Sequence, residues 1–189
     1  MNANAGIKVD KATFFRFIER QAEGRFEYDR GHIVQLMSGG TLRHASIIKR
    51  LEVAMDRQLD SLAWQITSQS RGVETSETVR YPDVLVEASG ADWQGLATTK
   101  PVLVIEVLSP TSEDIDLVIK PREYLSLPSL VAYIVASQNK PHLTVWLRDS
   151  DGGFPAEPNV VEGPDAVLAI DALGIDISLA EIYRRMTST

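Results

Sequence analysis

The stretch Pro101-Val102-Leu103-Val104-Ile105-Glu106-Val107-Leu108 is apolar at nearly every position. A second apolar run, residues 132–136 (AYIVA), follows at a distance of some two dozen residues. Continuous apolar runs of this length are typical of central strands that are covered on both faces. Residues 113–125 between them have a helical pattern, opened by a turn and cap region at residues 109–112. The order strand, helix, strand predicts an α/β fold, with a mixed sheet flanked by helices.

The strongest helical pattern lies earlier, over residues 42–62. Ile47, Leu51 and Met55 recur there at helical spacing with charged residues between them, so we expect a long amphipathic helix that packs these three side chains against the sheet. A shorter helix is predicted from Asp10, which is a good N-cap residue. The other elements predicted are a hairpin of residues 26–29 and 32–37 around Arg30-Gly31, strands at 64–67, 81–86 and 143–147, a loop at 149–158 and a helix at 179–186.

The composition sets bounds on the class of protein. The 189 residues are 44% hydrophobic and 24% charged, which suits one ordered globular domain spanning residues 1–189. Cysteine is absent, which excludes disulfides, thiolate zinc sites and cysteine nucleophiles. No segment has the apolar length of a signal peptide or a membrane span, so we expect a cytoplasmic protein. The formal charge of −7 counts against tight, non-specific DNA binding.

Two carboxylates interrupt apolar strand patterns. Asp83 follows Pro82 at the start of the strand pattern of residues 81–86, and Glu106 lies inside the central run. Buried carboxylates are costly unless they are paired or bound to a metal. We expect the two to lie on neighbouring strands as ligands of Mg²⁺, which prefers hard oxygen ligands. The alternatives are that Asp83 caps a turn and that Glu106 forms a buried ion pair with Lys120 or Arg122.

Two further charged residues are candidates for the same site. Lys120 lies in the segment that follows Glu106, and its ammonium could orient water or stabilise the charge that develops on a phosphate. Glu27 in the predicted hairpin is a fourth acidic candidate, although it could equally be an ordinary exposed strand residue. No G-x-S-x-G motif is present, which argues against a serine hydrolase.

The order of several blocks resembles a known family. The blocks FEYDRGHIVQLMSGG, RHASIIKRL, RYPDVLV, PVLVIEVLSPTSEDID and REYLSLPSL resemble the Uma-type family of restriction-endonuclease-like proteins, a branch of the PD-(D/E)XK nuclease superfamily. The resemblance covers residues 13–148. It implies a restriction-endonuclease-like core in which Asp83 and Glu106 bind the metal, Lys120 is the catalytic lysine, and Glu27 is the acidic residue before the glycine turn.

The chain departs from the superfamily pattern in two places. The superfamily lysine would stand two residues after Glu106, where this chain has Leu108, so the resemblance implies that the lysine has moved to the next helix. Pro121 follows Lys120 directly and disfavours helical geometry at the lysine. His44 matches a histidine common in the family; it could contact a phosphate or the surroundings of the metal, or simply cap and pack its helix.

Two functions from different classes follow. The first is a DNA endonuclease that uses Mg²⁺, with Mn²⁺ as a substitute, and acts as a homodimer because cutting both strands suits two-fold symmetry. The second is a degenerate module that keeps the fold and binds nucleic acid or a protein partner. Trp64, Trp93 and Trp146 are not grouped with basic residues in the sequence, so we expect them to pack in the interior rather than to stack on bases.

Overall fold

The computed structural model describes residues 8–21, 23–36, 40–90, 92–109 and 113–186. Its largest sheet has six strands in the order β11 (Asn159–Glu162), β10 (His142–Leu147), β9 (Ala132–Ala136), β8 (Pro101–Val107), β6 (Val84–Ala88) and β3 (Trp64–Thr67). The β8–β9 pair is parallel and the others in this sheet are antiparallel. The predicted mixed sheet is confirmed, and its two long apolar runs form the central strands β8 and β9.

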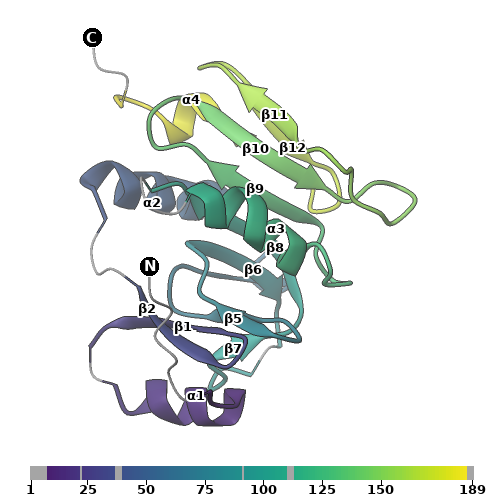
Figure 1. Cartoon of the computed structure of the whole chain (residues 1–189). Coiled ribbons are helices and arrows are strands. Elements are labelled where there is room, and N and C mark those ends of the chain that lie inside the picture. Colours follow the sequence, from purple (N-terminus) through teal and green to yellow (C-terminus); the bar gives the residue numbers. More distant parts are fainter. Residues whose placement is uncertain (1–7, 22, 37–39, 91, 110–112, 187–189) are drawn as a thin grey trace.

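A second sheet lies beside the first (Figure 1). It has five strands in the order β2 (His32–Leu36), β1 (Arg25–Asp29), β5 (Thr78–Arg80), β4 (Gly72–Glu74) and β7 (Ala97–Thr98). A separate hairpin follows near the end of the chain, made of β12 (Val167–Ile170) and β13 (Ile175–Ser178). The predicted hairpin is β1–β2, turning through Arg30 and Gly31 at positive φ, but Met37 lies outside the described residues.

The predicted strand at residues 81–86 is wrong in its bounds. β5 ends at Arg80 and belongs to the five-stranded sheet, whereas β6 begins at Val84 and belongs to the six-stranded one. The segment from Tyr81 to Asp83 connects the two sheets. Pro82 has no N–H to give to a strand ladder, which favours a break here. Asp83 therefore stands where the chain crosses from one sheet to the other.

The long helix α2 (Leu42–Asp56) packs on one face of the six-stranded sheet. Ile47, Leu51 and Met55 are completely buried, as predicted. The helix ends at Asp56 and not at Leu62, because Asp60 organises a turn: its side chain accepts from the Leu62 N–H and its carbonyl accepts from two following N–H groups. Aspartate readily replaces helical hydrogen bonds in this way. Leu62 is consequently exposed at the approach to β3.

The opposite face of that sheet is covered by α3 (Lys120–Tyr124), whose Tyr124 packs in a core with Leu85, Val104 and Tyr133. A π-helical turn, η1 (Ile115–Ile119), leads into α3. The expectation that Pro121 disfavours helical geometry at Lys120 is wrong, since Lys120 has φ −61° and ψ −34°. Pro121 stands at the first turn of α3, where a missing N–H costs little.

The remaining helices are short. α1 (Lys11–Glu19) lies against the five-stranded sheet (Figure 1), and Asp10 caps it by accepting from the Thr13 N–H, as predicted. α4 (Leu179–Ile182) covers only the first half of the predicted helix at 179–186, because Tyr183 leaves the helical conformation. Residues 149–158 are a loop between β10 and β11, as expected.

The tryptophans do not behave alike. Trp146 is buried and stacks on Tyr133, with ring centroids 5.4 Å apart, and Trp64 packs at the edge of the core. Trp93 is 80% exposed. The prediction that all three pack in the interior is wrong for Trp93, because the turn that carries it lies outside both sheets.

Candidate active site

Glu106 lies within β8, and Asp83 stands one residue before the neighbouring strand β6 rather than on a strand. β6 and β8 pair with Val84 opposite Ile105 and Leu85 opposite Val104, and continuing that register by one residue brings Asp83 opposite Glu106. Side chains alternate along a strand, so Glu106 lies on the same sheet face as Val104, the face that α3 covers. Asp83 and Glu106 are both buried, with residue exposures of 6% and 4%.

Glu106 is engaged by two groups from α3. The Lys120 ammonium donates to Glu106 Oε1 at 2.8 Å, and the Tyr124 hydroxyl donates to the same oxygen at 3.2 Å. Burial raises the pKa of Glu106 to about 8, with Asp116 and Asp83 adding to the rise and Lys120 opposing it. Burial is thus the main cost of the charged form of Glu106.

Lys120 lies between two carboxylates, 2.8 Å from Glu106 and 2.9 Å from Asp116, and is itself buried. Burial disfavours its charge, but the attraction of Glu106, Asp116 and Glu27 outweighs burial and raises the pKa of Lys120 above its usual value. Of the two partners considered for Glu106, the structure selects Lys120; Arg122 is exposed to solvent.

Asp83 is held by three donors. Oδ1 accepts from the Gln69 side-chain amide at 2.8 Å, and Oδ2 accepts from the Val107 N–H at 2.8 Å. Nε2 of His44 lies 3.2 Å from the same Oδ2. Burial alone would raise the pKa of Asp83, but the hydrogen bonds from His44, Gln69 and Val107 and the charge of His44 hold it below its usual value. The alternative that Asp83 caps a turn after Pro82 is thus not the geometry adopted.

His44 stands in the first turn of α2, where its N–H donates to the cap residue Thr41. Its ring reaches Asp83 and lies 3.1 Å from the Val107 carbonyl oxygen. The hydrogen bond to Asp83 is the largest cause of a raised pKa for His44, against partial burial. The histidine therefore contacts a candidate metal ligand rather than only packing its helix.

Glu27 on β1 is buried rather than exposed. Its Oε2 lies 3.1 Å from Arg80 and its Oε1 accepts from the Tyr81 N–H at 3.3 Å. Arg80 also binds Glu123 of α3, at 2.8 Å. These contacts tie the five-stranded sheet to α3, and Glu27 adds to the field that acts on Lys120.

Three residues that sequence reasoning missed complete the site: Gln69, Asp116 and Tyr124. Asp116 stands four residues before Lys120, a spacing at which side chains on a helical segment meet, so its pairing had a sequence signal. Gln69 had none. It adopts a left-handed conformation with φ 56°, which is rare for a residue other than glycine, and from there it reaches Asp83.

Asp83 and Glu106 are the residues that could hold a divalent cation. Within the described ranges, no group of three or more His, Cys, Asp or Glu side chains is arranged to do so. Mg²⁺, however, is commonly bound through one or two carboxylates and keeps several waters. Burial, with smaller contributions from Asp116 and Asp83, raises the pKa of Glu106, and a cation beside this pair would offset the cost of its charge.

Comparisons with known proteins come from sequence and from structure. The sequence profile of the Uma2 family, described as "Putative restriction endonuclease", matches residues 12–180. The chain is 31% identical to the uncharacterized protein slr1290 of Synechocystis sp. over 180 residues, which cover 94% of this chain and 92% of the relative. It is 27% identical to the uncharacterized protein sll1609 of the same organism over 139 residues, or 71% of this chain and 78% of that protein.

A solved structure shares the fold. The crystal structure of a putative nuclease belonging to DUF820 from Anabaena variabilis has a TM-score of 0.65 to this chain at 16% identity, covering 88% of this chain and 94% of that one. The expected restriction-endonuclease-like core is therefore confirmed. In the part of the chain that the structure describes, no helix combines the length and apolar character needed to cross a bilayer.

Proposed function

The chain belongs to the Uma2 family, and we propose that it is a nuclease that hydrolyses phosphodiester bonds of DNA. Its active site would contain Asp83 and Glu106 and would use Mg²⁺ or Mn²⁺. One observation carries the proposal: two buried carboxylates stand at the same end of a strand pair, Asp83 just before β6 and Glu106 within β8, with a buried lysine 2.8 Å from Glu106. Burial of this much charge costs several kcal/mol per ion unless it is compensated, and a catalytic site is a common reason for it.

Each residue has a role in this reaction. A bound divalent cation supplies a water of lowered pKa and neutralises phosphate charge. Asp83 offers a carboxylate whose orientation Gln69, Val107 and His44 fix. Glu106 offers the second carboxylate. The Lys120 ammonium stabilises the charge that develops on the phosphoryl oxygens.

The role of Glu27 is more distant from the chemistry. Arg80 neutralises it at 3.1 Å, so we propose that Glu27 acts through the field it exerts on Lys120. A part in holding a second metal ion would require the Glu27–Arg80 pair to open.

The second candidate is a module that binds nucleic acid or a protein without cleaving. The observation that favours it is the completeness of the contacts: both oxygens of Asp83 and Oε1 of Glu106 already have protein donors. A nuclease must exchange some of these for a cation. In a degenerate module, the same contacts would be permanent structural supports.

Calorimetric titration with Mg²⁺ and Mn²⁺ separates the two candidates. The nuclease proposal expects wild type to bind Mn²⁺ with a stoichiometry of about one and Asp83→Ala to lose that binding, while Asp171→Ala, at an exposed acid in a turn after β12, binds as wild type does. Wild type that takes up neither ion would support the module instead.

We also propose that the nuclease acts as a homodimer, because cleavage of both strands of a duplex suits two sites related by a two-fold axis. Sedimentation equilibrium of the free protein and of the protein with a duplex oligonucleotide tests this. A monomer under both conditions would contradict it.

A further inference from the structure

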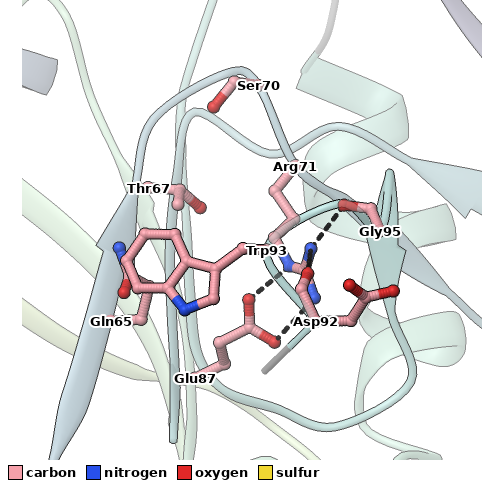
Figure 2. Close-up of a pocket in the computed structure, with 8 residues that line it drawn as sticks. All are labelled: Gln65, Thr67, Ser70, Arg71, Glu87, Asp92, Trp93 and Gly95. Atoms are coloured by element: carbon pink, nitrogen blue, oxygen red, sulfur yellow. Dashed lines mark hydrogen bonds and ion pairs between the residues drawn. The ribbon is translucent and has the colours of Figure 1, made fainter. Parts of the chain in front are cut away.

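A cavity of about 180 Å³ opens beside the edge strand β3. Its lining comes from β3, from the segment between β3 and β4, from the end of β6 and from the turn before β7: Gln65, Thr67, Ser70, Arg71, Glu87, Asp92, Trp93 and Gly95. Figure 2 shows the Trp93 indole with the side chains of Gln65 and Thr67 on one side and the ion pair of Arg71 and Glu87 on the other.

The wall of this cavity is built by Arg71. Its guanidinium forms an ion pair with the buried carboxylate of Glu87 and donates to the carbonyl oxygens of Asp92 and Gly95. These bonds hold in place the turn that carries Trp93. Because Glu87 neutralises Arg71, the cavity has no surplus positive charge with which to hold a phosphate.

The groups left to contact a ligand suit a planar, polar ring. Trp93 is 80% exposed, so one large aromatic surface is free to stack. In the part of the chain that the structure describes, the side chains of Gln65, Thr67 and Ser70 have no hydrogen-bond partner, which leaves donors and acceptors facing the cavity. An aromatic face beside free hydrogen-bonding groups is the combination that binds an unpaired nucleobase.

The cavity lies on the same sheet face as the candidate active site. β3 pairs with β6 so that Gln65 is opposite Glu87 and Thr67 is opposite Leu85. Side chains alternate along β6, so Glu87 and Leu85 share one face, and Asp83 stands four residues before Glu87 in the chain. The four residues from Asp83 to Glu87 span about 13 Å at the rise of a β-strand. In a nucleic acid, this distance is about four base steps when the bases are stacked and fewer when the chain is extended. The cavity therefore lies within a few nucleotides' length of Asp83.

We propose that this cavity is a base-binding subsite, in which an unpaired base of a single-stranded nucleic acid stacks on Trp93 and bonds to Gln65 and Thr67. The proposal rests on the proposed nuclease function. It limits the substrates of that nuclease to nucleic acids with at least one unstacked base. The neighbouring ion pair of Arg71 and Glu87 fixes the position of Trp93 and does not contact the phosphates.

Binding in the absence of divalent ions tests the subsite apart from catalysis. The probe is a fluorescently labelled oligothymidylate in EDTA buffer, followed by anisotropy. Trp93→Ala should weaken binding roughly tenfold to a hundredfold, the effect of losing one stacked base, and Trp93→Phe should lose less. Val160→Ala is the control, since Val160 is an exposed apolar residue on β11 at the opposite edge of the sheet. Equal melting curves would show that all three variants are folded.

The outcomes separate this inference from the proposed function. Wild type that binds the probe through Trp93 but cuts no DNA would support the subsite and overturn the nuclease. Wild type that cuts DNA while Trp93→Ala binds the probe unchanged would overturn the subsite alone. Absence of binding by wild type, or equal competition by a blunt duplex of the same length, would also overturn it.

Discussion

The Lys120 ammonium lies 2.8 Å from the Glu106 carboxylate inside the protein, and a second carboxylate, Asp116, lies 2.9 Å away on its other side. Glu106 comes from a central strand, whereas Lys120 and Asp116 come from the helical segment that covers it. This cluster is the centre of the proposed site. It also makes the stability of the protein depend on charges that catalysis would use.

Replacing Lys120 by methionine should affect both stability and activity. Because Glu106 and Asp116 then lose their shared cation, we expect the free energy of unfolding to fall by about 3–5 kcal/mol. Turnover should fall about a hundredfold or more, measured well below the melting temperature.

The matched control is Arg122→Met, two residues away but exposed. It should change neither the unfolding midpoint in urea nor the cleavage rate. If Lys120→Met cuts as fast as wild type, another residue stabilises the charge on the phosphate. Lys120→Arg keeps the positive charge, so comparing its activity with that of Lys120→Met separates the loss of charge from a loss of folding.

The pKa of Glu106, raised to about 8 by burial, predicts how stability changes with pH. A carboxyl whose pKa is higher in the folded protein contributes stability below its unfolded pKa of about 4.3. That contribution is lost as pH rises toward 8. Glu106→Gln removes this loss, so in metal-free buffer its free energy of unfolding should exceed that of wild type by on the order of a few kcal/mol at pH 9.

The same variant should lose Mn²⁺ binding together with cleavage, since a ligand is gone. Denaturant unfolding at pH 5 and pH 9 measures the stability effect, with Glu157→Gln, an exposed residue of the loop before β11, as the control. A difference between Glu106→Gln and wild type that is the same at both pH values would speak against the raised pKa.

The His44–Asp83 contact predicts a different pH window. The pKa of His44 is raised in the folded protein, so its contribution is complete below the unfolded value of about 6.5 and is lost as pH rises through the folded one. The pKa of Asp83 is lowered, so its contribution holds above about 3.9 and is lost as pH falls through the folded value. The pair should stabilise most between these limits.

His44→Asn should therefore reduce the free energy of unfolding at pH 6 by about 1 kcal/mol, allowing for the partial exposure of the ring. The deficit should shrink by pH 9. Thermal unfolding at the two pH values measures it, and His32→Asn on β2 is the control. A deficit that grows with pH would show that the histidine acts by packing alone.

Much of the local structure could be predicted from the sequence. Helical spacing identified the buried face of α2, the N-cap Asp10 placed the start of α1, and the apolar runs placed β8 and β9. These signals are local, because each depends on residues within a few turns of one another. The candidate pair Asp83 and Glu106 was visible for the same reason, since each interrupts an apolar strand pattern.

The division into two sheets could not be predicted, because it depends on pairings between distant segments. β4 and β7 have only three and two residues, too few to show an alternating pattern. Gln69 reaches Asp83 because its backbone adopts a left-handed conformation, which the presence of a glutamine does not predict. Trp93 is brought beside Arg71 by the turn between β6 and β7, although the two are far apart in sequence.

The most direct test of the account is the cleavage of supercoiled plasmid DNA with Mn²⁺, comparing wild type with Asp83→Asn. Asn keeps the size of the side chain but removes its charge and one acceptor oxygen, so cation binding at Asp83 should weaken, and a melting curve checks that the variant is folded. We expect wild type to nick the plasmid only when Mn²⁺ or Mg²⁺ is present, and Asp83→Asn to be slower by about a hundredfold or more. Cleavage by Asp83→Asn at the wild-type rate, or wild type that leaves the plasmid intact with either ion, would contradict a metal-dependent nuclease site at Asp83 and Glu106.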